Sequence, residues 1–270
     1  MNNLLGHYTN LSSLEYILHE MKLKFGSFNL TNDPYENRNL EFSIWGEDGI
    51  TAYDSSLFIN DGKLRKPFKL LCFSVSGKID FFYERPRMWS QYADNHNGCC
   101  LILDKNKFDG KFSALKIKSK KSKSPVYYTL DKKKKKVSDL CEKLSGLGQD
   151  FHIHKITDCL YKSKRLFLYS KMYDWKQEKE YRYCIYANSD SDDIFIDISD
   201  SLKEILLGEK VSPLYRDMLY KWVKGMNIKV SYIGWENGFP YKIPLNDDYY
   251  KSRDIVEKHK IEASIPQIPD

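Results

Sequence analysis

Hydrophobic and polar positions change their period within the first 21 residues. Leu4–Thr9 fits a short strand, and from Leu11 to Met21 the apolar residues recur three or four positions apart, as on one face of a helix. Ser12 and Glu15 have the spacing of a capping box, so we expect the helix to start at Ser12. The chain is therefore predicted to open with a strand, a tight turn and a helix.

Apolar runs bounded by turn-forming residues predict the strands that follow. They are Leu23–Phe28, Phe68–Ser76, Gly98–Leu103, Tyr181–Tyr186, Ile194–Ile198 and Ile228–Ile233. Apolar spacing predicts helices over Val137–Leu144 and Phe151–Leu168. Ser212-Pro213 is a suitable N-cap and first residue for a further helix, which Gly225 ends.

Strands and helices do not alternate regularly along the chain, so the pattern favours an α+β fold over a doubly wound sheet. We expect one α+β domain over residues 1–240. Residues 241–270 lose periodicity and gain proline, which predicts a surface-wrapping or partly disordered C-terminal tail. No leader sequence or long apolar segment is seen, so we expect a cytoplasmic protein with no membrane partner.

The positive charge of the chain is concentrated in one segment. The formal net charge is +6, and residues 116–136 carry most of the excess. Because this segment has no apolar periodicity, apart from a short strand candidate at Val126–Leu130, we interpret it as a basic insertion or loop. The alternative is a surface that contacts a phosphate backbone.

The six cysteines have no regular spacing, and we interpret His152 and His154 as a pair on a helix surface, because no acidic or cysteine ligands complete a metal set with them. The sequence therefore predicts neither a metal site nor a disulfide framework.

His7, Tyr8 and Thr9 form the first candidate site. On a strand, His7 and Thr9 share one face and Tyr8 lies on the other. A polar pair just before a helix N-terminus is suited to a ribose hydroxyl and a phosphate. The alternative is that His7 is a buried, hydrogen-bonded residue without a ligand.

A turn at residues 31–36 supplies further candidates. Asn32, Asp33 and Glu36 lie around Pro34, and loops on a rigid scaffold often contact substrate. Such residues also commonly cap backbone amides in a turn, which is the alternative here.

Glu178, Glu180 and Arg182 alternate at the start of an apolar strand, which predicts that they share one face. Arg182 can hold one carboxylate through a two-point hydrogen bond, leaving the other to balance positive charge in a transition state. An exposed strand edge protected by charges is the other interpretation.

Two more pairs accompany these segments. Ser74 and Ser76 alternate on one strand face, and Trp89 and Tyr92 have the spacing of one helical face. We include the serines among the cofactor-binding candidates and the aromatic residues among the substrate-binding ones, with core packing as the alternative for at least one ring.

Taken together, HYT near the start, NDPYE, CFS, MWSQYADNHNG and the K-x3-W-x2-E-x-EYR segment resemble the bacterial family called domain of unknown function 2971 (DUF2971). The resemblance covers roughly residues 5–210.

The chain also resembles the ADP-ribosyltransferase superfamily, whose members open with a histidine-bearing strand followed by a helix. The resemblance implies a split mixed sheet with flanking helices, NAD as substrate and no metal. It implies that His7 contacts the NAD ribose, with Tyr8, Thr9, Ser74, Ser76 and Arg182 completing the cofactor site. Glu180 would be the catalytic carboxylate, assisted by Glu178.

The function implied by this resemblance is transfer of ADP-ribose from NAD to a macromolecular acceptor, protein or nucleic acid, by a toxin or anti-phage defence protein with a partner protein or antitoxin. One alternative is a non-catalytic module that binds a nucleotide or nucleic acid through residues 116–136 and aromatic side chains. A metal-independent nuclease using His7 and Glu180 is the other.

Overall fold

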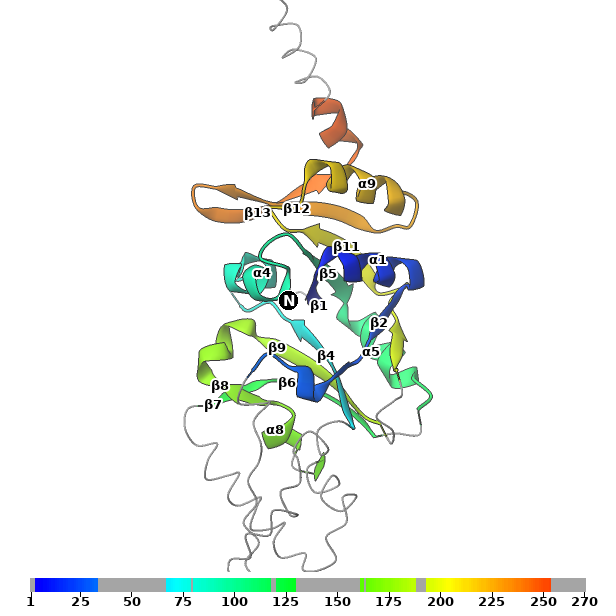
Figure 1. Ribbon diagram of the computed structural model, residues 1–270, viewed down its shortest axis with the longest axis vertical. Coiled ribbons are helices and arrows are strands. Elements are labelled where there is room, and N and C mark those ends of the chain that lie inside the picture. The colour runs from blue at the N-terminus through cyan, green and yellow to red at the C-terminus, as the bar shows by residue number, and fades with distance from the viewer. Residues whose placement is uncertain are drawn as a thin grey trace, which may run out of the picture. The chain divides into compact units, whose positions relative to one another are not determined.

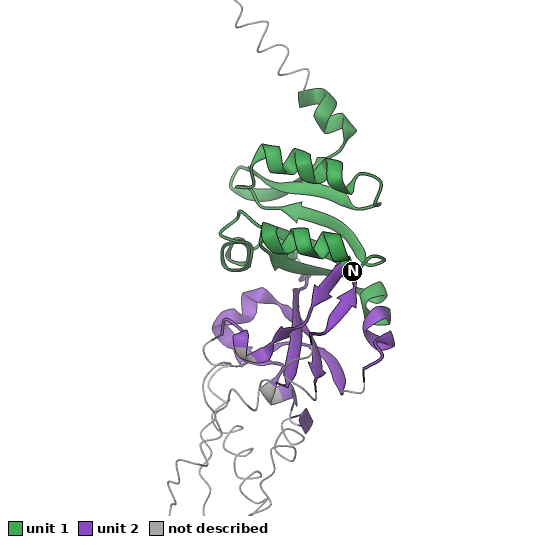
Figure 2. Ribbon diagram, turned by 45° about the vertical axis from the view of Figure 1, so that its right-hand side comes forward, with its two compact units in different colours: residues 1–21, 78–110, 198–270 green, residues 22–77, 111–197 purple. Residues whose placement is uncertain are grey.

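The computed structural model describes residues 3–33, 67–78, 80–117, 120–129, 161–162, 164–187 and 193–253 (Figure 1). The chain divides into two compact units, shown in Figure 2. Unit 1 comprises residues 1–21, 78–110 and 198–270, and unit 2 comprises residues 22–77 and 111–197. Both contain strands and helices, which confirms the mixed α+β class. The prediction of one domain over 1–240 stays a prediction.

Unit 1 is built on a mixed sheet with strand order β13-β12-β11-β5-β1. Its strands are β1 (Leu4–Thr9), β5 (Cys99–Asp104), β11 (Leu202–Leu207), β12 (Lys229–Glu236) and β13 (Phe239–Leu245). Its helical elements are α1 (Leu11–Glu20), η3 (Phe82–Glu84), α4 (Pro86–Tyr92) and α9 (Pro213–Val223), while α5 (Lys105–Ala114) begins in unit 1 and ends in unit 2. β11 and β12 are parallel, and the other pairs are antiparallel. β5 is buried from Cys99 to Leu103, as expected for an apolar run in the middle of a sheet.

Unit 2 contains an antiparallel sheet in which β3 pairs with β4, β4 with β9, and β9 with β6. Two smaller pairings are β10 with β2, antiparallel, and β7 with β8, parallel. The strands are β2 (Lys22–Lys24), β3 (Gly26–Ser27), β4 (Phe68–Ser74), β6 (Lys121–Pro125), β7 (Tyr127–Thr129), β8 (Ser170–Met172), β9 (Glu180–Tyr186) and β10 (Phe195–Asp197). The helical elements are η1 (Phe28–Leu30), α8 (Lys164–Phe167) and η4 (Tyr173–Glu178).

The start of α1 differs from the predicted one. The N-cap is Asn10, whose Oδ1 accepts from the Ser13 backbone N–H at 2.7 Å, and the helix begins at Leu11. The capping box at Ser12 was therefore wrong. Asn10 already lies where the extended backbone of β1 ends, so its side chain reaches the orphan amide first. The N-cap predicted at Ser212 is confirmed, because its side chain accepts from Tyr215 N at 3.2 Å.

The basic segment is partly built into the sheet. Residues 121–125 form β6, and Lys121 lies opposite Ile185 of β9. The loop interpretation was wrong for residues 121–125, because pairing with β9 satisfies their backbone without requiring apolar side chains. That residues 116–136 are an insertion stays a prediction. The strand expected at Val126–Leu130 is confirmed as β7. Residues 130–136 and the predicted helix 137–144 lie outside the described residues.

At the C-terminal end, regular structure continues past residue 240. β13 pairs with β12 as far as Leu245, although Pro240 and Pro244 lack an N–H. β13 is the last strand of the order, and prolines are tolerated on such an edge strand. The expected tail therefore contributes a strand to unit 1 before the described residues end at 253.

Candidate functional site

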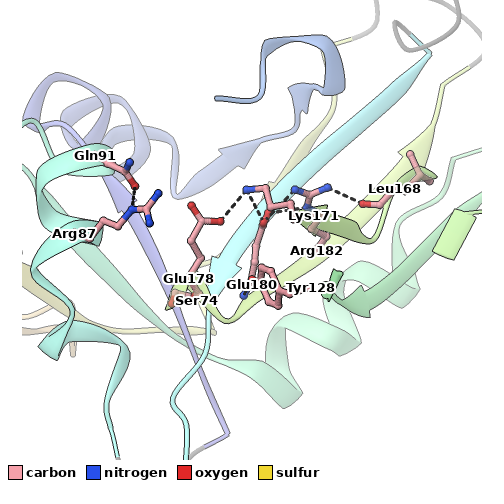
Figure 3. Close-up of polar contacts among 9 residues, drawn as sticks. All are labelled: Ser74, Arg87, Gln91, Tyr128, Leu168, Lys171, Glu178, Glu180 and Arg182. Atoms are coloured by element: carbon pink, nitrogen blue, oxygen red, sulfur yellow. Dashed lines mark hydrogen bonds and ion pairs between the residues drawn. The ribbon is translucent and has the colours of Figure 1, made fainter. Parts of the chain in front are cut away.

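The start of β9 holds a buried ion pair. Strand alternation places Glu180 and Arg182 on the same face. Arg182 donates from Nε to Glu180 Oε1 at 2.7 Å and from a terminal nitrogen to Oε2 at 3.0 Å (Figure 3). Its other terminal nitrogen donates to the Leu168 carbonyl at 2.7 Å. Because Arg182 is 0 % exposed and Glu180 6 %, both charges are removed from water.

A lysine from a second strand completes this cluster. Lys171 of β8 donates from Nζ to Glu178 Oε2 at 2.8 Å and lies 3.0 Å from Glu180 Oε2. Figure 3 shows its amino group between the two carboxylates. Two carboxylates and two cations give a net charge of zero, which is how a buried cluster avoids an unpaired charge. We call Lys171, Glu178, Glu180 and Arg182 the buried charge cluster.

Glu178 belongs to a different element from the one predicted. It ends the 3-10 helix η4, and Lys179 follows with a φ of 43°, so the chain turns before β9 begins. The prediction that Glu178 shares the strand face of Glu180 was therefore wrong in its geometry. The Ser74 hydroxyl at the end of β4 donates to the Glu178 carbonyl at 2.6 Å and holds this turn against the sheet.

The surroundings of Glu180 fix its charge state. Burial by itself raises the pKa of Glu180, but the positive charges of Arg182 and Lys171 outweigh that effect and hold the pKa well below its usual range. On β4 the Cys72 thiol has its pKa raised, first by burial and then by the negative charge of Glu180. The Glu180 carboxylate is therefore ionised and fixed in orientation.

The backbone of Glu180 is held as well. Its N–H donates to the Tyr128 hydroxyl of β7 at 2.8 Å. Burial raises the pKa of Tyr128, so this phenol stays protonated. The orientation of the carboxylate thus depends on β4, β7, β8 and β9 together.

In unit 1, three of the predicted site residues, Tyr8, Thr9 and Tyr92, line a hollow. Tyr8, Thr9, Asn10, Ser12, Gln91, Tyr92 and Asp94 line an open hollow of about 400 Å³. Tyr8 is buried, and its hydroxyl donates to the Phe82 carbonyl at 2.7 Å. His7 and Thr9 are half-buried on the other face of β1, as predicted from alternation, but His7 is not among the lining residues. The hollow brings hydroxyls, amides, a carboxylate and an aromatic ring together.

Other candidates have varied surroundings. Trp89 is 2 % exposed and donates from its ring N–H to the Tyr83 carbonyl at 2.8 Å, so it packs in the core of unit 1. Ser76 has a buried hydroxyl without a hydrogen-bond partner among the described residues. Asn32 is exposed and Asp33 buried. Glu36 lies outside the described residues.

Sequence reasoning assigned no site role to Lys171, Tyr128 or Cys72, although Lys171 begins the K-x3-W-x2-E-x-EYR motif and Cys72 begins CFS. One signal for Lys171 was available: Glu178, Glu180 and Arg182 sum to a net negative charge, so burying them requires another cation. The contact itself could not be predicted, because β8 is short and is positioned by its pairing with β7.

No group of three or more metal-ligating side chains occurs among the described residues. Within the same residues, no helix is long and apolar enough to cross a membrane.

Residues 88–183 match the family described as protein of unknown function DUF2971. The matched segment contains both MWSQYADNHNG and Glu178 of the buried charge cluster, so the resemblance to DUF2971 is confirmed over this segment. The comparisons with curated proteins and with solved structures gave no match.

Proposed function

We propose that this protein is an ADP-ribosyltransferase-like enzyme that uses NAD as its donor. The observation that carries the proposal is the fixed, ionised carboxylate of Glu180 at the start of β9, next to the hydroxyl-bearing end of β4 in the register Ser74↔Glu180. Glu178 is the second carboxylate of the same cluster. This arrangement keeps Glu180 ionised and oriented, which a group that stabilises a transition state requires.

The proposed reaction breaks the bond between the nicotinamide nitrogen and ribose C1′. Nicotinamide leaves with the bonding electron pair, and positive charge develops on the sugar. A preorganised negative charge stabilises such a transition state without reorganisation at the moment of reaction. The acceptor then forms a bond to C1′ and releases its proton, giving ADP-ribosylated acceptor and free nicotinamide.

The test is release of nicotinamide from NAD by purified protein, alone and with cell lysate, followed by chromatography. Glu180→Gln keeps the shape and removes the charge, so we expect turnover to fall by about a hundredfold or more. Glu204→Gln is the matched control, because Glu204 is also buried and paired with one lysine, Lys242, at 2.9 Å, but lies in unit 1.

Thermal melting of each variant separates chemistry from folding. Folded Glu180→Gln protein with wild-type nicotinamide release would contradict the proposal. A loss of release that only follows the folded fraction would show that Glu180 is a structural ion-pair partner.

The hollow of unit 1 favours a second candidate, a nucleotide-binding module without catalysis. Its lining offers hydroxyls and amides for a ribose, the Asp94 carboxylate as a hydrogen-bond acceptor, and the Tyr92 ring as an apolar surface. Thr9→Val removes one hydroxyl at nearly constant shape and is expected to weaken NAD binding in calorimetry. Thr129→Val in β7 is the control, and NAD binding without nicotinamide release would favour this candidate.

A further inference from the structure

Three ring–cation pairs lie in unit 2, on β7, α8 and η4 and at Tyr161. Lys164 Nζ lies 5.0 Å from the centre of the Tyr161 ring, and the Arg165 guanidinium lies 4.1 Å from that of Tyr127. In η4, Lys176 Nζ lies 4.1 Å from the centre of the Tyr173 ring. We call these six residues the basic aromatic surface.

Strand pairing brings these pairs into one neighbourhood. Tyr127 opposes Ser170 in the β7–β8 pair, and Tyr173 follows β8 directly. The Tyr161 hydroxyl donates to the Lys121 carbonyl of β6 at 3.1 Å. Figure 1 shows β7 beside β8. The surface therefore combines Tyr127 with residues between 161 and 176, which are separate from it in sequence.

The cations of this surface differ from Lys171 in their ion pairing. Lys171 is buried against two carboxylates, whereas none of Lys164, Arg165 and Lys176 forms an ion pair with a carboxylate of the described residues. Arg165 and Lys176 are exposed, and Tyr127 and Tyr173 are 38 % and 41 % exposed as residues. Positive charge and aromatic surface are thus both available to a partner.

We propose that the basic aromatic surface binds single-stranded nucleic acid, and that this strand is the macromolecular acceptor of the proposed reaction. The role as acceptor rests on the proposed function, whereas binding does not. Lysine and arginine neutralise the phosphates of a strand, and exposed tyrosine rings stack on its bases without regard to sequence. An acidic protein would use the charges but not the rings.

The experiment measures fluorescence anisotropy of labelled oligo(dT) and oligo(U) of about 20 nucleotides, between about 50 and 200 mM salt, without NAD. The test variant is the triple substitution Lys164→Gln, Arg165→Gln and Lys176→Gln. We expect it to weaken binding by about tenfold to a hundredfold. The slope of log affinity against log salt concentration should also become less negative by about 2, because three phosphate contacts are lost.

The matched control removes the same charge from exposed lysines of unit 1, by Lys203→Gln, Lys221→Gln and Lys229→Gln. We expect this control to bind nearly as wild type does. Tyr127→Ala is expected to lose about tenfold, and Tyr16→Ala, which alters a ring that is 78 % exposed on α1, to lose nothing. Preference for oligo(U) over oligo(dT), or the reverse, identifies the strand as RNA or DNA.

Equal losses in the two triple variants would overturn the proposal, as would equal competition by poly-glutamate at matched ionic strength or failure of the wild-type protein to bind either oligonucleotide. Glu180→Gln separates the two proposals. Normal oligonucleotide binding by this variant is expected, and a wild-type protein that binds strands but releases no nicotinamide would reject the proposed reaction and leave the binding surface standing.

Discussion

Glu180 and Arg182 lie two residues apart on β9 and form a two-point ion pair with distances of 2.7 and 3.0 Å. Lys171 of β8 also contacts this carboxylate, with its Nζ 3.0 Å from Glu180 Oε2. The carboxylate is thus held from two strands, and its orientation is a property of unit 2 as a folded whole.

The ion pair makes Arg182 a strong determinant of stability. Arg182→Met leaves the Glu180 carboxylate buried with one cation fewer, so we expect unfolding free energy to fall by about 3–5 kcal/mol. Urea denaturation measures the loss. Lys24→Gln breaks the exposed pair of Lys24 with Asp193 at 2.8 Å and should cost less than about 1 kcal/mol. Similar losses for both variants would contradict the buried cluster.

Acid should destabilise unit 2 through Glu180. Its pKa in the folded protein is held below the value of about 4.3 typical of an unfolded chain. A lowered pKa contributes stability that is present above pH ~4.3 and is lost as the pH falls from there towards the folded-state pKa. We expect unfolding free energy measured from pH 7 to pH 3 to fall less steeply in Glu180→Gln than in wild type. Parallel curves would show that Glu180 does not titrate with folding.

The basic segment should contain a structural lysine. Lys121 Nζ donates to the carbonyls of Phe112, Ser113 and Leu115 at 2.9, 2.6 and 2.9 Å, where α5 ends. Lys121→Met leaves these carbonyls without that donor and should cost about 1–3 kcal/mol. Lys116→Met, at an exposed position nearby, should stay within about 0.5 kcal/mol of wild type. Thermal and urea unfolding of the two variants test the difference.

The hollow of unit 1 depends on two backbones packed closely. A Cβ at Gly98 would lie 2.3 Å from the carbonyl oxygen of Thr9, a residue that lines the hollow. Gly98→Ala should therefore destabilise the protein by at least about 2 kcal/mol. Gly110 has no atom within 4 Å of the added Cβ and lies in α5, so Gly110→Ala should stabilise by about 0.5–1 kcal/mol. Opposite signs in thermal melting are the expected result.

Much of the local structure could be read from the sequence, because apolar runs and helix caps act over a few residues. The strands at β4, β5, β9 and β12 and the N-cap at Ser212 follow from such patterns. β6 could not be predicted in the same way. Its side chains are lysine and serine, and its backbone is ordered by β9, which lies about 60 positions away in sequence.

In the candidate site, too, some features follow from the local sequence and others depend on distant segments. Alternation along β9 by itself determined that Glu180 and Arg182 share a face, since successive strand side chains point in opposite directions. Only tertiary structure decided that the pair is buried, that Lys171 neutralises it, and that Glu178 reaches it from η4 after a left-handed turn at Lys179. The physical reason is that side-chain direction is set by the local backbone, whereas burial and charge balance depend on which distant strands pair with it.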